Sequence, residues 1–431
     1  MNVDKLVFTL TTTSGNTKIE QESRTPSKAG FGQKFRRFIQ TWAGIATIIG
    51  TIVAILVAIW QFSSGSPINS PAKQPHAGAN INQSTESTGM AIDHQNVLIY
   101  AGEAGQILPV KSIGDWQQRR RQILDGMQQA MGPLPSRENQ VPFEIEVLEM
   151  VRIASFERRK ISMAVEPGSR LHAYLFIPAG LKAGERVPGL LALHPTHPLG
   201  KGDTAGLSGR ENRAYGLELA QRGYVVMVPD YPSFGDDAEY DFSADRYLSG
   251  SMKGIFNHIR CVDYLCSLAM VDSARLGAIG HSLGGHNAMF VGAFDTRLKV
   301  IVASCGWTPF HHYYEGKIDG WTSDRYMPRL REVYGLEPDR VPFDFYEVVA
   351  ALAPRAFFSN SPLRDSNFDY RGVQKAIPEA AKIYRLYHAE SLLQVRYPDC
   401  EHDFPPEIRE EAYRFIDRIL SHRPREISPE E

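Results

Sequence analysis

One continuous stretch, Arg275 to Phe290 (RLGAIGHSLGGHNAMF), combines a strand pattern, a tight turn and the start of a helix. The apolar run Leu276–Ile279 is short enough for a buried strand, and the residues after the turn predict a helix to Phe294. Between them lies Gly280-His281-Ser282-Leu283-Gly284, a G-x-S-x-G sequence. In this context the motif indicates a nucleophile elbow, a turn whose central residue is strained and whose flanking residues must be small. The alternative is a glycine-rich turn that contains a serine by chance, but the flanking strand and helix favour the elbow.

The remaining pattern predicts a sheet with helices on both faces. Phe143–Val151, Arg159–Val165 and Leu171–Ile177 alternate apolar and polar residues, whereas Val187–Leu193 is continuously apolar, as a strand buried on both faces requires. Later strands alternate with helices. The strands are predicted at Tyr224–Val228, Leu276–Ile279, Val300–Ser304, Ala356–Phe358 and Leu392–Tyr397, and the helices at Trp116–Gly132, Glu211–Arg222, Lys253–Leu268, Ser282–Phe294, Val373–Tyr387 and Ile408–Leu420. This order indicates the α/β class, with antiparallel N-terminal strands and a doubly wound, mostly parallel sheet.

An apolar run from Trp42 to Phe62 follows a polar tail, residues 1–40. A membrane-spanning helix needs about 20 such residues, whereas the apolar core of a signal peptide has about 7–15. We therefore predict one transmembrane anchor over residues 41–62, with a cleaved signal peptide as the alternative. Basic residues at positions 34, 36 and 37 precede the run, and only Lys73 lies soon after it. The positive-inside rule then places the N-terminus in the cytoplasm and the rest of the chain outside, with the lipid bilayer as a partner.

Residues 63–90 are rich in Ser, Asn, Gly and Pro, so we predict a flexible tether over 63–112 and a folded domain over 113–425. The net charge of −2 argues against nucleic acid as a partner. The four cysteines, Cys261, Cys266, Cys305 and Cys400, show neither a C-x-x-C pair nor a zinc spacing, and the sequence leaves one or two disulfides open.

Partners for Ser282 are predicted at the ends of later strands. A serine hydroxyl needs a histidine base, and the histidine needs a carboxylate that fixes its tautomer. In sheets of this kind the chain order is Ser, then acid, then His. The loop after Ala356–Phe358 offers Asp365 and Asp369, and the loop after Leu392–Tyr397 offers His402. We prefer Asp365 because it follows its strand more closely.

Two backbone N–H groups are needed to bind an oxyanion. One is predicted at Leu283, beside the nucleophile, and the other in the loop after Val187–Leu193. Pro195 has no N–H, so Thr196 is the first choice and His197 the next. The histidines of this loop lack a carboxylate or cysteine partner at a metal-binding spacing, and we predict neither a metal nor a cofactor.

From about Trp116 onward the chain resembles the α/β-hydrolase superfamily, in particular the branch of dienelactone-hydrolase-like proteins, acetyl xylan esterases and prolyl-oligopeptidase-type domains. The resemblance is carried by LHPTHPLGK, VPDYPSFGD, GHSLGGH and the Asp365 and His402 loops. It implies a serine esterase with Ser282, His402 and Asp365 as its triad. Dienelactone hydrolases use a cysteine nucleophile, so Ser282 favours esters over dienelactones. Glucuronoyl esterases carry Arg after the serine, where this chain has Leu283.

An insertion at about residues 306–345 lies where such folds place a cap over the nucleophile. It contains Trp307, Phe310, Tyr313, Tyr314, Trp321, Tyr326 and Tyr334. Aromatic faces suit sugar rings or acyl groups, and they suit a packed cap core equally well. We therefore expect a membrane-anchored hydrolase of carboxylic esters, with carbohydrate or small-molecule esters as substrates. A serine peptidase of the prolyl-oligopeptidase type and a catalytically silent binding protein are the alternatives.

Overall fold

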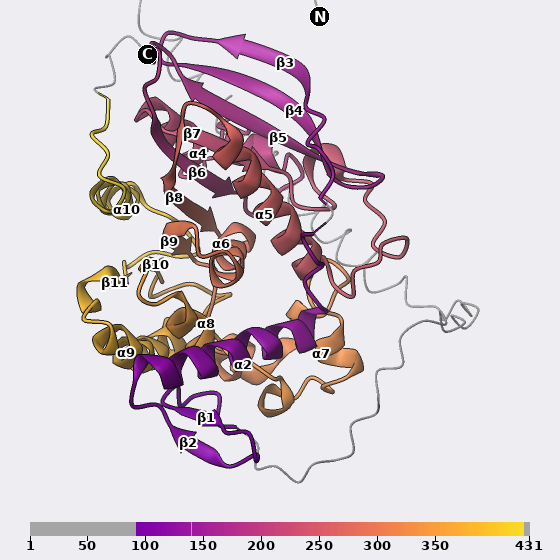
Figure 1. Ribbon diagram of the computed structural model, residues 1–431, viewed down its shortest axis with the longest axis vertical. Helices are drawn as coiled ribbons and strands as arrows, with labels where there is room; N and C mark the ends of the chain where they lie inside the picture. The colour runs from indigo at the N-terminus through magenta and orange to yellow at the C-terminus, as the bar shows by residue number, and fades with distance from the viewer. Residues whose placement is uncertain (1–91, 139, 426–431) are drawn as a thin grey trace, which may run out of the picture. The chain divides into compact units, whose positions relative to one another are not determined.

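The computed structural model describes residues 92–138 and 140–425 (Figure 1). The predicted tail, the anchor and the tether up to residue 91 lie outside these residues, so those assignments stay predictions. Where the structure describes the chain, no helix combines the length and the apolar character that crossing a membrane requires.

A nine-stranded sheet runs through the described chain (Figure 1). Its strands are β3 (Glu146–Arg152), β4 (Phe156–Glu166), β5 (Ser169–Pro178), β6 (Val187–Leu193), β7 (Val225–Pro229), β8 (Val271–His281), β9 (Leu298–Ser304), β10 (Ala356–Asn360) and β11 (Leu393–Arg396). Their order across the sheet is β11-β10-β9-β8-β6-β7-β5-β4-β3. The pairs β3–β4, β4–β5 and β5–β7 are antiparallel, and all the others are parallel. The predicted α/β sheet, mostly parallel with antiparallel N-terminal strands, is confirmed.

Helices bury both faces of this sheet. Side chains alternate along a strand, so Leu191 and Leu193 of β6 belong to one hydrophobic core, and Leu190 and Ala192 to a second. Residues of α2 (Ile113–Met131), α5 (Gly250–Ser267), α6 (Leu283–Phe294), α8 (Phe345–Leu352) and α9 (Tyr370–Leu386) join the first core. Residues of α4 (Tyr215–Gln221) and α10 (Pro406–Ile419) join the second. Burial on both faces explains why β6 has a continuously apolar sequence.

Capping residues explain why several helices begin at positions other than those that the sequence pattern predicts. Helix α5 begins before Lys253 because the Ser249 side chain accepts a hydrogen bond from the N–H of Met252, at 3.0 Å. Helix α9 likewise begins before Val373, after the N-cap Asp369. Helix α8 was not predicted, and its N-cap Asp344 forms a capping box with Glu347.

Helix α4 starts later than the predicted Glu211, because Asn212 has a φ of 60°, outside the helical region. A four-residue helix, α3 (Lys201–Thr204), precedes it.

A small hairpin lies within the predicted tether. Strands β1 (Ile99–Ala101) and β2 (Ile107–Pro109) pair antiparallel, and Val97 and Tyr100 are buried in the first core. The side chain of Gln122 on α2 binds both the N–H (3.0 Å) and the carbonyl (2.7 Å) of Ala101. The folded part of the chain therefore begins before Ile113, where the sequence pattern placed its start.

The insertion at about residues 306–345 folds as short helical turns. They are η2 (Phe310–Gly316), η3 (Ile318–Trp321), α7 (Arg329–Glu332) and η4 (Pro338–Arg340). Trp307 and Phe310 are fully buried in the first core, whereas Tyr314 is 48% exposed. Part of the aromatic set therefore packs the insertion itself, which is the second of the two roles considered for it.

Candidate active site

Ser282 occupies a sharp turn between β8 and α6. Its backbone has φ 56° and ψ −119°, a conformation that side chains rarely adopt, so the turn is strained as the elbow motif predicts. The turn admits only small flanking residues. A Cβ on Gly280 would lie 2.1 Å from the carbonyl oxygen of Gly284, and a Cβ on Gly284 would lie 1.9 Å from that of Leu193. The two glycines of the motif are therefore required by close backbone contacts.

Hydrogen bonds anchor this turn to the end of β9. The N–H of Ser282 donates to the carbonyl of Ser304 at 2.8 Å, and the N–H of Gly285 donates to the carbonyl of Ser282 at 2.9 Å. The ring of His281 binds the Ser304 hydroxyl through Nδ1 at 2.9 Å, and burial lowers the pKa of His281 well below its usual value. The elbow is thus held by the neighbouring strand rather than by its own sequence alone.

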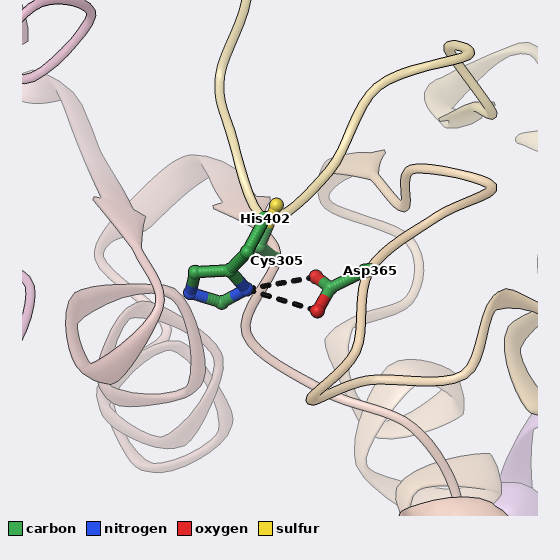
Figure 2. A group of neighbouring side chains, drawn as sticks. All are labelled: Cys305, Asp365 and His402. Carbon is green, nitrogen blue, oxygen red and sulfur yellow. Dashed lines mark hydrogen bonds and ion pairs between the residues drawn. The ribbon is translucent and has the colours of Figure 1, made fainter. Parts of the chain in front are cut away.

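Asp365 and His402, from the loops after β10 and β11, face each other (Figure 2). The Nδ1 atom of His402 lies 3.0 and 2.9 Å from the two carboxylate oxygens of Asp365. The carboxylate also accepts hydrogen bonds from the N–H groups of Asn367 (2.8 Å) and Phe368 (3.1 Å). A carboxylate held in this way orients the imidazole ring.

Asp369, the other acid considered, makes different contacts. Its side chain accepts a hydrogen bond from the N–H of Arg371 at 2.9 Å, at the start of α9, and pairs with the Arg371 guanidinium. Its nearest histidine is His312, at 4.0 Å. Within the described residues, the structure brings Asp365 and not Asp369 to His402.

His402 lies beside the elbow. Its ring centroid is 5.0 Å from that of His281, the residue before Ser282, and the ring of Phe368 stacks on it at 6.0 Å. The loop of His402 is tied to the sheet by Asn360, whose side-chain amide donates to the carbonyl of Asp403 and to the Ser304 hydroxyl, both at 2.8 Å. Side chains at the ends of β8, β9 and β10 therefore position the histidine loop.

A cavity of about 140 Å³ opens next to Ser282. Thr196 and Leu283, the two residues predicted to supply oxyanion donors, both line it. The N–H groups of Thr196 and Leu283 take part in no hydrogen bond with the rest of the described chain. His197, the second choice, lies in the same loop, where its Nδ1 accepts a hydrogen bond from the N–H of Leu199 at 3.2 Å. The cap contributes Tyr313, Trp321 and Tyr326 to the cavity wall.

Cys305 adjoins the Asp365–His402 pair (Figure 2), and sequence reasoning gave it no role there. One ligand atom of each residue lies within 4.8 Å of the others, and this combination of side chains is one that metal ions bind. Here, however, the thiol lies 3.2 Å from the carbonyl oxygen of Asp403, and burial raises the pKa of Cys305 well above its usual value. These contacts place the Cys305 thiol in a hydrogen bond to the loop that carries His402, directly beside the Asp365–His402 pair. All four cysteines of the chain are free.

Comparisons with known proteins agree with this architecture. The family described as "Alpha/beta hydrolase family" matches residues 204–423, slightly more than half of the 431 residues. YtaP of Bacillus subtilis (strain 168), provisionally named a hydrolase, is 26% identical over 314 residues, which cover 70% of this chain and 99% of YtaP. Carbohydrate esterase MZ0003, from an unknown prokaryotic organism, is 23% identical over 342 residues, covering 67% of this chain and 78% of the esterase.

Among solved structures, the glucuronoyl esterase from Solibacter usitatus shares the fold. Its TM-score is 0.56 at 18% identity, and the match covers 77% of this chain and 98% of that enzyme. The elbow at Ser282, the strand order and the family match lead to the same conclusion: the chain belongs to the alpha/beta hydrolase family.

Proposed function

We propose that this protein is a serine esterase that hydrolyses carboxylic esters, with carbohydrate esters as its preferred class. The observation that carries the proposal is the position of a carboxylate-bound histidine beside the turn that holds a strained serine. Ser282 lines the cavity, and the His402 ring, bound to Asp365, lies next to the elbow. A serine esterase needs these three groups in these roles.

The hydrogen bond to Asp365 determines how His402 acts. A carboxylate only accepts hydrogen bonds, so Nδ1 of His402 carries the proton and Nε2 keeps a free lone pair. Nε2 takes the proton of Ser282 as its oxygen attacks the ester carbonyl, and then returns that proton to the leaving alcohol. Water attacks the resulting acyl-enzyme with the same histidine as base. Asp365 stabilises the imidazolium formed in each half of the reaction.

The N–H groups of Leu283 and Thr196 are the proposed donors to the oxyanion. Both residues line the cavity, and Leu283 begins α6, whose N-terminal dipole favours negative charge. Loss of one such donor typically costs about 100- to 1,000-fold in turnover. These donors need no metal ion to stabilise the charge.

The preference for carbohydrate esters is supported by two of the similar proteins. One is named a carbohydrate esterase and the other a glucuronoyl esterase. The residue after the nucleophile is Leu283 here, which departs from the arginine expected in glucuronoyl esterases. We therefore favour acyl groups on sugars over glucuronoyl esters.

Three measurements on the purified domain test the enzymatic function. A fluorophosphonate probe should label the protein at Ser282, and Ser282→Ala should abolish both labelling and ester hydrolysis. Acetylated sugars should be cleaved much faster than peptidyl amides. Absence of labelling would favour a silent binding protein, and faster cleavage of the amides would favour a peptidase.

We also propose that residues 41–62 anchor the enzyme in a membrane with the catalytic domain outside the cytoplasm. The support is the length and composition of the run, together with the basic residues before it. External protease added to whole cells should digest the domain and leave the 1–40 tail protected. Recovery of the whole domain in the soluble fraction without its first 62 residues would overturn the anchor.

A further inference from the structure

The wall of the cavity beside Ser282 holds two buried polar side chains without partners. His286 and Trp321 both line the cavity and are each only 3% exposed. Neither ring nitrogen of His286 makes a hydrogen bond of good geometry to the described chain, although the backbone of Gly306 lies close enough to act on the ring, and the indole nitrogen of Trp321 has no partner there either. Buried polar groups are nearly always hydrogen-bonded, so the missing partners of these two side chains must come from what fills the cavity, either water or a bound ligand.

These two side chains lie next to each other on different parts of the fold. His286 is on α6, one turn after Ser282, and Trp321 ends η3 in the cap. Their ring centroids are 4.8 Å apart at an interplanar angle of 66°, and Tyr326 lies 5.9 Å from His286. The nitrogen atoms are thus set among aromatic faces.

The chemistry of the wall selects an uncharged, hydroxylated ligand. Burial lowers the pKa of His286 to about 3, with a smaller opposing effect from the backbone of Gly306, so the ring is neutral near pH 7. Neutral imidazole offers one donor and one acceptor, and indole offers one donor. A third polar group is Asn367, whose Oδ1 accepts a hydrogen bond from the Tyr314 hydroxyl at 2.7 Å. No Lys, Arg, Asp or Glu of the described chain lines this cavity.

The volume of the cavity and its aromatic lining further restrict the kind of ligand that it can bind. A volume of about 140 Å³ suits a single six-membered ring, because a cavity of about 150 Å³ accommodates benzene. A hydroxyl group both donates and accepts, which matches neutral imidazole, and the C–H faces of a sugar ring pack on aromatic side chains.

We propose that His286 and Trp321 form a subsite that binds the hydroxyl groups of one neutral sugar ring of the ester substrate. This inference rests on the proposed esterase function and identifies the residues that give it a preference for sugars. His286 acts here as a specificity-determining residue, beside the proposed Ser282–His402–Asp365 chemistry.

The test compares two acetate esters of similar shape. The first is an O-acetylated methyl pentopyranoside with free neighbouring hydroxyls, and the second is cyclohexyl acetate, whose ring has none. We expect wild type to prefer the sugar ester in kcat/KM. His286→Phe should lower this preference about tenfold, the effect of one neutral hydrogen bond, and Trp321→Phe should lower it similarly. His286→Asn, which keeps a donor and an acceptor, should restore part of the preference.

His258→Phe is the matched control. His258 on α5 is also buried, with an unpartnered Nδ1, but it does not line the cavity. Its replacement should leave the ratio of the two kcat/KM values unchanged. Thermal unfolding of every variant separates lost recognition from lost folding. If His286→Phe does not fold, His286→Asn and Trp321→Phe carry the test.

Three results would overturn the subsite. The first is an unchanged ratio of the two kcat/KM values in the folded His286 and Trp321 variants. The second is a loss of sugar preference in His258→Phe as large as that in His286→Phe. Both would leave the esterase function intact. Failure of wild type to cleave either ester would instead overturn the proposed function, and the subsite with it.

Discussion

The imidazole of His402 is held by the carboxylate of Asp365, whose oxygens lie 3.0 and 2.9 Å from Nδ1. The side chain of Asp365 is fully buried, whereas that of His402 is 24% exposed. The backbone N–H groups of Asn367 and Phe368 donate to the same carboxylate, so the acid is held by its own loop as well as by the histidine. In a Ser-His-Asp triad the acid orients the histidine, and a buried Asp365 behind a partly exposed His402 fits that role.

Replacing this acid by its amide tests that relationship. Asp365→Asn keeps the size of the side chain but can donate to Nδ1, which favours the wrong tautomer of His402. We expect kcat to fall about 10,000-fold with little change in substrate binding. Steady-state kinetics on an acetate ester measures both quantities.

Asp369→Asn is the control for that substitution. Asp369 caps α9, and asparagine caps helices about as well, so the loss should be far smaller. A larger loss in Asp369→Asn than in Asp365→Asn would identify Asp369 as the acid.

The close contact between Gly284 and β6 predicts a second result. A Cβ at Gly284 would lie 1.9 Å from the carbonyl oxygen of Leu193, and a backbone atom cannot move aside as a side chain can. Gly284→Ala should therefore destabilise the fold by about 1–3 kcal/mol and slow fluorophosphonate labelling of Ser282. Chemical denaturation and labelling kinetics measure the two effects.

Gly114→Ala is the matched substitution. The nearest atom to its added Cβ is 3.7 Å away, an ordinary contact, and the residue lies near the start of α2. Alanine favours a helix over glycine by about 1 kcal/mol, so this variant should be as stable as wild type or slightly more so. Equal stabilities of the two variants would show that the elbow tolerates a larger residue.

Buried histidines predict a loss of stability in acid. Burial, reinforced by the neighbouring His194 and His286, lowers the pKa of His258 to about 3. Between pH 6.5 and 3 the unfolded chain therefore binds one more proton at this residue than the folded chain does. The free energy of unfolding falls with decreasing pH over this range, by about 1.4 kcal/mol per pH unit for each such histidine.

His258→Phe should reduce the pH dependence of the free energy of unfolding by the contribution of one histidine, about 1.4 kcal/mol per pH unit. Urea unfolding at a series of pH values between 4 and 7 gives the slope directly. Phe256→Leu, a buried change on the same helix that removes no titratable group, should shift the curve without changing its slope. An unchanged slope in His258→Phe would mean that this histidine binds protons equally in the folded and the unfolded chain, so that folding does not lower its pKa.

Much of the candidate site could be predicted because its parts follow strands directly. Ser282 follows β8, and the loops after β10 and β11 carry Asp365 and His402. The carboxyl ends of parallel strands meet at one edge of a sheet, so chain order alone predicts that such residues converge. The hydrophobic pattern also predicted every strand of the nine-stranded sheet. It placed several helix starts wrongly, because capping residues determine where those helices begin.

The features of the site that the sequence did not predict depend on contacts between residues far apart in the chain. His286 contacts Trp321 and Tyr326 across more than thirty residues, and no local pattern links them. Cys305 follows β9 at the same edge as the other site residues, which was a usable signal, but its contact with the Asp403 carbonyl depends on the last loop. The three-residue strands β1 and β2 are too short to show any period.

Cys305 provides the final prediction, which concerns metal dependence. The proposed mechanism uses His402 as the base and Asp365 as its orienting acid without a metal ion, and the Cys305 thiol is hydrogen-bonded to the Asp403 carbonyl. Dialysis against EDTA should therefore leave kcat unchanged. Cys305→Ala should keep kcat within about tenfold of wild type, because the thiol donates to the loop that carries His402 and not to the substrate.

Cys261→Ala, which removes a fully buried thiol from α5, controls for the stability cost of losing a buried sulfur. Elemental analysis of the purified protein completes the experiment. A bound zinc ion that is lost in Cys305→Ala but kept in Cys261→Ala, with activity lost in EDTA and restored by zinc, would make Cys305, Asp365 and His402 a metal site. That result would require a different mechanism, because a metal on Asp365 and His402 would remove the acid and the base from the proposed triad.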